Sequence, residues 1–257
     1  LRNTSLMLSN IAHILNKKED EEYYFNFSNK VADAYESIFT DKKGKLHNEF
    51  QTGYVLPLQF NMFSEYNKKA AAYNLKKLVE KHNYCIGTGF PGTPYILFAL
   101  VDNGYVKEAY KMLENTICPS WLYEVKVGAT TIWERWDALD ENGECEIGDD
   151  GTGGMISFNH YASGSVGDFL YRRVAGIEPI ECGYKKFLIK PVLGGTLTYA
   201  KAETKTSYGI IKSDWKIENN KFKLSVTVPY GCEAKIVLPN GDTFIRTHGE
   251  YLFENDL

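Results

Sequence analysis

Residues 119–137 read PSWLYEVKVGATTIWERWD, and this stretch decides how the rest of the chain is interpreted. It contains Trp121, Trp133 and Trp136, three of the four tryptophans of the protein. It also opens a connection of roughly forty residues between two helical patterns, and a loop of that length inside a compact domain is usually functional or disordered. Its aromatic content argues against disorder. We therefore expect residues 119–137 to contribute to a functional site.

Helical periodicity lies on both sides of this stretch. Apolar side chains recur every three or four residues in four ranges: 8–15, 31–39, 71–79 and 106–113. Further helices are predicted for residues 52–63 and 159–175. Another should begin after Thr93, which would be its N-cap, with Pro94 in the first turn. Together these segments predict about seven helices in antiparallel pairs.

The period changes to two after Gly183. Apolar residues alternate with polar ones in two clear runs, Phe222, Leu224, Val226, Val228 and then Ala234, Ile236, Leu238. The pairs Asn219-Asn220 and Asn240-Gly241 are typical hairpin turns. This pattern predicts an antiparallel β-sandwich. We place a helical domain at residues 1–178 and the sandwich at residues 179–257.

Composition excludes several classes of function. The net charge is −4 without a basic cluster, which argues against a nucleic-acid partner. No run of apolar residues is long enough to span a membrane. The five cysteines are dispersed and odd in number, so we expect free thiols and hence a reducing compartment such as the cytoplasm. The histidines are also dispersed, so no metal site is predicted.

The central candidate for chemistry is Glu134, which lies between Trp133 and Trp136. Aromatic faces bind the apolar faces of sugar rings, and partial desolvation tunes a carboxylate for acid–base catalysis. Arg135 and Asp137 can either keep this glutamate ionised or bind sugar hydroxyls. The alternative interpretation is a structural ion pair between Glu134 and Arg135 among core tryptophans.

Five motifs occur in a fixed order: QTGY at 51–54, TGFPGTP at 88–94, PSWLY at 119–123, WERW at 133–136 and SFNHYA at 157–162. They closely resemble the C-terminal part of the catalytic domain of bacterial α-L-rhamnosidases. The segment GYKKF at 183–187, with Lys190-Pro191, resembles the start of the C-terminal β-sandwich of that family. The resemblance covers nearly all of the chain from Gln51 onward.

This resemblance implies part of an (α/α)6 toroid followed by the sandwich. It also implies inverting hydrolysis of terminal α-L-rhamnosyl residues from glycosides or polysaccharides, without a cofactor. Glu134 matches the general base of the family, and His160 matches a histidine that helps bind the sugar. We add Trp133, Arg135, Trp136 and Phe90 as expected sugar contacts, with Tyr95 beside Phe90 on a pocket-wall loop.

The sequence also departs from the family. The family's general acid lies in an acidic, Arg-containing motif that has no counterpart here, since the acidic run at 19–22 is typical of a solvated helix face. We therefore expect a C-terminal portion that carries the base without the acid and is inactive alone. Residues 139–154 are an acidic, glycine-rich insertion in which Asp149-Asp150 lacks the spacing of a Ca²⁺ loop.

Several alternatives remain open. The chain can be a non-catalytic carbohydrate-binding protein, or a toroid glycosidase that acts on another sugar. A helical scaffold predicts that Trp133 and Trp136 are buried with no cavity beside Glu134. The sandwich can either bind glycans through Trp215 or Tyr230 or only pack against the helices. Apolar helix faces left uncovered by a partial ring favour a homodimer.

Overall fold

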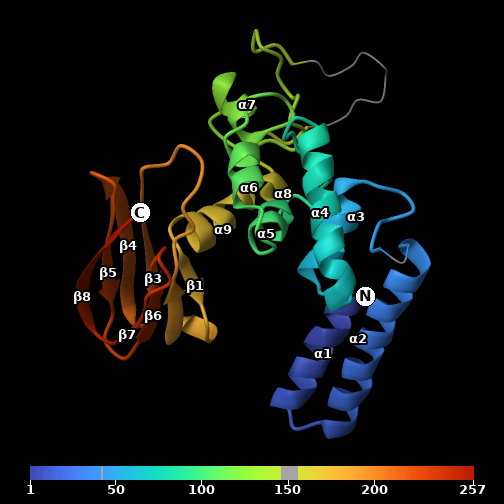
Figure 1. Ribbon diagram of the computed structural model, residues 1–257, viewed down its shortest axis with the longest axis horizontal. Coiled ribbons are helices and arrows are strands. Elements are labelled where there is room, and N and C mark those ends of the chain that lie inside the picture. The colour runs from blue at the N-terminus through green and yellow to red at the C-terminus, as the bar shows by residue number, and fades with distance from the viewer. Residues whose placement is uncertain (42, 146–155) are drawn as a thin grey trace. The chain divides into compact units, whose positions relative to one another are not determined.

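The computed structural model describes residues 1–41, 43–145 and 156–257 (Figure 1). These residues form two compact units, Leu1–Gly164 and Ser165–Leu257. The predicted domain boundary between residues 178 and 179 lies within the second unit and stays a prediction. Asp149-Asp150 and most of the insertion at 139–154 lie outside the described residues.

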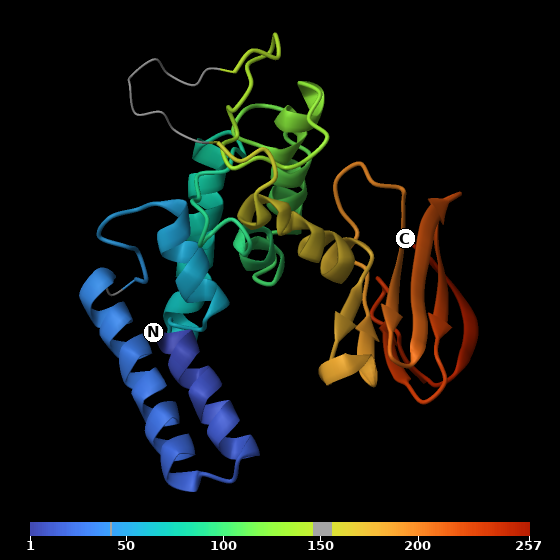
Figure 2. The same cartoon turned by 180° about the vertical axis from the view of Figure 1, so that it is seen from behind.

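The first unit is helical, as predicted. Its helices are α1 (Arg2–Ile14), α2 (Lys18–Phe39), α3 (Gln51–Gln59), α4 (Glu65–Lys81), α5 (Ile96–Val101), α6 (Val106–Leu113), α7 (Trp121–Lys126) and α8 (Tyr161–Gly164). Helices α1 and α2 form an antiparallel pair that both ribbon views show side by side (Figures 1 and 2). The core of this unit includes Tyr54, Leu75 and Leu100, which are fully buried. The acidic run at 19–22 lies in the first turn of α2, where acidic side chains favour the helix dipole.

Three helix predictions need correction. The helix expected from Thr93 begins only at Ile96, because the Thr93 hydroxyl donates to the carbonyl of Gly89 at 3.0 Å and residues 91–95 form turns. The helix expected at 52–63 ends at Gln59. The helix expected at 159–175 is divided into α8, α9 (Val166–Phe169) and a π-helical turn (Leu170–Val174).

Helix α7 was not predicted. It lies inside the long connection and begins after Ser120, whose hydroxyl accepts the Tyr123 N–H at 3.2 Å as an N-cap. Only six residues long, α7 is too short to show helical periodicity in the sequence. It nevertheless organises the segment that contains the WERW motif, as described below.

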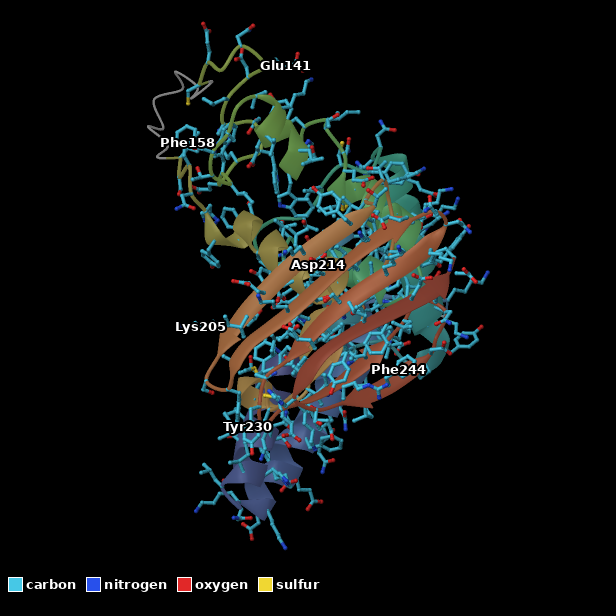
Figure 3. All side chains as sticks on the ribbon, turned by 90° about the vertical axis from the view of Figure 1, so that its left-hand side faces the viewer. Glu141, Phe158, Lys205, Asp214, Tyr230 and Phe244 are labelled. Atoms are coloured by element: carbon cyan, nitrogen blue, oxygen red, sulfur yellow. The ribbon has the colours of Figure 1, made fainter. Side chains whose placement is uncertain are left out.

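The second unit contains eight strands: β1 (Ile177–Pro179), β2 (Lys186–Ile189), β3 (Tyr199–Thr206), β4 (Gly209–Glu218), β5 (Lys221–Val228), β6 (Glu233–Val237), β7 (Thr243–Arg246) and β8 (Gly249–Asp256). They form two four-stranded sheets with the orders β1-β2-β6-β7 and β3-β4-β5-β8. Figure 3 shows the second sheet with its side chains, and Lys205 and Asp214 lie on two of its strands. All pairs are antiparallel except β2 with β6, which is parallel.

The predicted alternation and turns of this unit are confirmed. The four apolar residues of β5 are all buried, and Asn219 and Asn220 adopt positive φ at the β4–β5 turn. Trp215 is also fully buried, and its indole N–H donates to the carbonyl of Val174 at 2.8 Å. Glycan binding through Trp215 is therefore wrong, because its ring has no exposed face. Tyr230, by contrast, is 81% exposed.

The structure also bears on the expected free thiols, membrane spans and exposed apolar helix faces. All five cysteines are free thiols. Across the described ranges, no helix is both long and apolar enough to cross a membrane. On α1, Leu8 and Ile11 are exposed although they share one apolar face, and so is Leu15 at the C-cap of this helix. The predicted homodimer stays a prediction.

Candidate active site

Two main-chain hydrogen bonds join the segment of the WERW motif to the SFNHYA motif. The N–H of Glu134 donates to the carbonyl of Ser157 at 2.8 Å, and the N–H of His160 donates to the carbonyl of Ile132 at 2.8 Å. The Ser157 N–H in turn donates to Oε2 of Glu134 at 2.9 Å. Both the main chain and the carboxylate of this half-buried glutamate are therefore held by one neighbouring residue.

His160 lies between two other rings. Its imidazole stacks on Phe90, with ring centroids 4.4 Å apart and planes at 24°, and also on Tyr161 at 5.3 Å. The N–H of Ala162 donates to Nδ1 of His160 at 3.3 Å. Because Nδ1 accepts, a neutral imidazole carries its proton on Nε2, which is then available as a donor. The structure thus brings Phe90 and His160 together, as the prediction of a common pocket requires.

The loop that carries Phe90 is fixed by Gln51, whose amide is buried. The Gly87 N–H donates to Oε1 of this amide at 2.6 Å, and its Nε2 donates to the carbonyl of Cys85 at 3.1 Å. A Cβ on Gly92 would lie 2.9 Å from Oγ1 of Thr52. The QTGY and TGFPGTP motifs are therefore one packed unit, and its conformation leaves the ring of Phe90 45% exposed.

The tryptophans have different environments. Trp133 is only 2% exposed and meets Phe158 edge to face, with centroids 5.6 Å apart. Trp136 is half-buried and meets Trp121 edge to face at 5.6 Å. The burial of Trp133 is the feature that a scaffold interpretation expects. Trp136 retains an accessible surface.

Arg135 forms an ion pair with Asp137. Its Nε and Nη2 donate to the two carboxylate oxygens at 3.1 and 3.0 Å. These hydrogen bonds hold the pKa of Asp137 below its usual range. This pair is distinct from the Glu134–Arg135 pair of the alternative interpretation, and both of its side chains are exposed.

Glu124 is a potential functional residue that the sequence did not reveal. It lies on α7, is 1% exposed, and its Oε2 accepts the N–H of Trp133 at 3.1 Å. Burial raises the pKa of this carboxyl to about 7. The available signal was its spacing of three from Trp121, which places both residues on one helical face, but that signal requires α7 to be recognised first.

Comparison with known proteins identifies the family. Residues 1–174 match the domain described as bacterial alpha-L-rhamnosidase 6 hairpin glycosidase domain. The chain belongs to the bacterial α-L-rhamnosidase family. Residues 176–252 match the bacterial alpha-L-rhamnosidase C-terminal domain. The predicted family and fold class, helical hairpins of a toroid followed by a β-sandwich, are confirmed.

Curated α-L-rhamnosidases are similar over most of this chain. The Streptomyces avermitilis enzyme is 35% identical over 240 residues, which are 93% of this chain and 23% of the relative. A Formosa agariphila enzyme is 37% identical over 235 residues, which are 90% of this chain and 25% of the relative. The chain thus spans about a quarter of the length of these rhamnosidases.

Solved α-L-rhamnosidase structures have the same fold in this region. The native Aspergillus terreus enzyme superposes with a TM-score of 0.92 and 35% identity, covering 98% of this chain and 29% of the other. The Streptomyces avermitilis enzyme, solved in complex with L-rhamnose, superposes with a TM-score of 0.91 and 30% identity. The match covers 99% of this chain and 26% of the other. The similarity to these rhamnosidases therefore includes both the helical and the β-sheet unit of this chain.

Proposed function

We propose that this chain provides the general base and part of the sugar pocket of an inverting α-L-rhamnosidase. The enzyme would hydrolyse terminal α-linked L-rhamnosyl residues of glycosides or polysaccharides. The observation that carries the proposal is the arrangement around Glu134. Its carboxylate is held by Ser157, and the same paired segments carry His160, on which Phe90 stacks. Membership of the rhamnosidase family supports the substrate class.

In this mechanism Glu134 removes a proton from a water molecule while that water attacks the anomeric carbon. The hydrogen bond from the Ser157 N–H fixes Oε2, so Oε1 is the oxygen better placed to take the proton. The bond from C1 to the aglycone oxygen breaks, and that oxygen receives a proton from a general acid. In an inverting site the two carboxyl groups lie roughly 6.5–9.5 Å apart to admit the water.

The other predicted residues would bind the sugar. Nε2 of His160 is available as a donor to a sugar hydroxyl, while Phe90 and Trp136 present accessible aromatic surface to the ring. Arg135, paired with Asp137, would contribute at the exposed side. Trp133 would support the pocket wall through its contact with Phe158.

The general acid is expected outside this chain. No acidic motif of the family's type occurs in the sequence, and the chain spans about a quarter of its curated relatives. We therefore propose that the chain acts as the C-terminal portion of a longer enzyme. The chain alone should not hydrolyse p-nitrophenyl α-L-rhamnoside. Turnover by these 257 residues that disappears in Glu134→Gln would contradict the incomplete site.

The direct test uses the full-length protein that carries this chain. Removal of a general base costs about 10²- to 10⁴-fold in rate, so Glu134→Gln should lower kcat by that factor. Glu65→Gln, an exposed change on α4, should leave kcat unchanged. Proton NMR should show β-L-rhamnose as the first product of the unmodified enzyme. Near-normal kcat in Glu134→Gln would exclude this residue as the base.

Nucleophile rescue gives a second readout. Azide needs no deprotonation before it attacks the anomeric carbon, so it should bypass a missing base. In Glu134→Ala, added azide should restore release of p-nitrophenol and yield the β-L-rhamnosyl azide. Absence of rescue, together with full activity of the unmodified enzyme, would place Glu134 in a role other than deprotonation of water.

A further inference from the structure

The carboxyl group of Glu124 is buried and contacts the residue that precedes the candidate base. One oxygen, Oε2, accepts the peptide N–H of Trp133 at 3.1 Å, and Trp133 immediately precedes Glu134 in the chain. The other oxygen, Oε1, is buried and has no hydrogen-bond partner among the described residues. Glu124 therefore contacts the segment of the base through the backbone of Trp133.

Helix α7 makes further attachments to the same region. The indole N–H of Trp121 donates to the carbonyl of Ser163 at 2.9 Å, three residues beyond His160. The hydroxyl of Tyr123 donates to the carbonyl of Leu139 at 3.1 Å. With Glu124 bound to Trp133, three side chains of one short helix hold the chain before Glu134, after Glu134 and after His160.

Stability alone is a poor explanation for a carboxyl group at this place. Burial of an ionisable group that is incompletely paired costs more free energy than a single hydrogen bond to a peptide N–H returns. One of the two carboxyl oxygens of Glu124 is without a partner among the described residues. What the group does provide is a fixed acceptor at the peptide next to Glu134.

We propose that Glu124 is a positioning residue for the hydrolysis, which fixes the Trp133 peptide and so aims the Glu134 carboxylate at the attacking water. This inference rests on the function proposed above. The Trp133–Glu134 segment is then held at two consecutive residues, by Glu124 at the Trp133 peptide and by Ser157 at Glu134. Loss of the buried contact should let Glu134 shift, and a displacement of about 1 Å can cost about 10²-fold in rate.

The kinetic test compares two variants of the full-length protein. Glu124→Gln keeps an oxygen acceptor for the Trp133 N–H, so its kcat should stay within about fivefold of the unmodified enzyme. Glu124→Leu has a similar volume and no acceptor, so kcat should fall by about 10²-fold while KM changes less than about threefold. A purely structural role predicts a lower melting temperature but an unchanged kcat for the folded fraction, which would overturn the inference.

A measurement on the 257-residue chain separates this inference from the proposed function. The amide proton of Trp133 should exchange slowly with solvent in the unmodified chain and in Glu124→Gln, and at least about tenfold faster in Glu124→Leu. Rapid exchange in the unmodified chain would overturn the inference even if Glu124→Leu does not fold. Slow exchange combined with a full-length protein that does not hydrolyse rhamnosides would instead refute the proposed function.

Discussion

The ring of Phe90 stacks on the imidazole of His160, although the two residues belong to different motifs far apart in the sequence. Each ring is anchored by its own backbone contacts. The loop of Phe90 is held by the buried amide of Gln51, and the N–H of His160 is bound to the carbonyl of Ile132. The imidazole therefore has its position fixed relative to the segment that carries Glu134.

Removal of the Phe90 ring should weaken substrate binding. Stacked aromatic pairs contribute about 0.5–1.5 kcal/mol beyond their buried area, which corresponds to a roughly fivefold change in affinity at 1 kcal/mol. In the full-length protein, Phe90→Ala should raise KM for p-nitrophenyl α-L-rhamnoside by about fivefold and change kcat by less. Phe90→Tyr keeps the stacked ring and serves as the control. An unchanged KM in Phe90→Ala would show that His160 does not depend on this contact.

Glu124 should make folding stability fall as the pH rises. Burial raises the pKa of its carboxyl from 4.5 to about 7, so between these values the folded chain holds a proton that the unfolded chain has released. The contribution lost across this window is about 3 kcal/mol, since one pKa unit corresponds to about 1.4 kcal/mol. Urea unfolding of the chain at several pH values should show this decline, and Glu124→Gln should flatten it.

The neighbourhood of Glu124 provides a control for that measurement. Burial also raises the pKa of the nearby Cys118 thiol, to about 11, so this thiol stays neutral throughout the window. Cys118→Ser should therefore leave the slope of stability against pH unchanged. A slope that persists in Glu124→Gln would assign the effect to another group.

Glu178 should make folding stability fall as the pH is lowered, which is the opposite of the effect of Glu124. Burial opposes its charge, but hydrogen bonds from Arg172 and Arg173, the latter at 2.7 Å, outweigh that effect and lower the pKa of Glu178. A lowered pKa stabilises the fold at pH values above the ordinary glutamate pKa, and this contribution is lost as the pH falls from there through the lower pKa of the folded state.

Glu178→Gln should accordingly destabilise the chain by about 1–3 kcal/mol at neutral pH, because it weakens charge-assisted hydrogen bonds at a mostly buried site. The difference from the unmodified chain should begin to shrink as the pH falls below the ordinary glutamate value of 4.5, and it should vanish only once the pH has fallen through the lower pKa of folded Glu178. Glu181→Gln removes an exposed pair with Lys186 and should cost less than about 1 kcal/mol at any pH. If urea unfolding shows that Glu178→Gln and Glu181→Gln lower stability equally, burial does not explain the contribution of Glu178.

The sequence predicted those features that depend on local patterns. Alternating apolar residues predicted β5, and Asn219-Asn220 predicted its turn, because two-residue hairpins need residues that tolerate positive φ. The order of five motifs predicted the family, since each retains distinctive aromatics and glycines. These signals need no knowledge of which distant segments meet.

Features that depend on tertiary contacts were missed. The parallel pairing of β2 with β6 joins strands that are not consecutive, and local alternation says nothing about strand direction. Thr93 and Pro94 match a helix start, yet Thr93 bonds to Gly89 and the helix begins later. The sequence does not single out Glu124, since only the fold of α7 places it against Trp133.

A backbone prediction concerns Gly176, which follows the π-helical turn. It has a φ of +83°, and a Cβ there would lie 2.3 Å from the nitrogen of Pro191 and 2.5 Å from the carbonyl carbon of Lys190. These are main-chain atoms, so no side-chain rotation can relieve the clash. Gly183 has a similar φ of +76°, but a Cβ added there would have nothing within 4 Å, so this glycine isolates the cost of the left-handed conformation.

Gly183→Ala should therefore cost about 1–2 kcal/mol of stability. Gly176→Ala should cost at least about twice as much, because a Cβ at this position also displaces the strand end at which the Lys190 N–H donates to the Gly176 carbonyl at 2.9 Å. Thermal unfolding of the two variants beside the unmodified chain measures both losses. Equal losses of stability in the two variants would show that the backbone at Pro191 can move to accommodate a Cβ. Gly176 would then be required only for its positive φ.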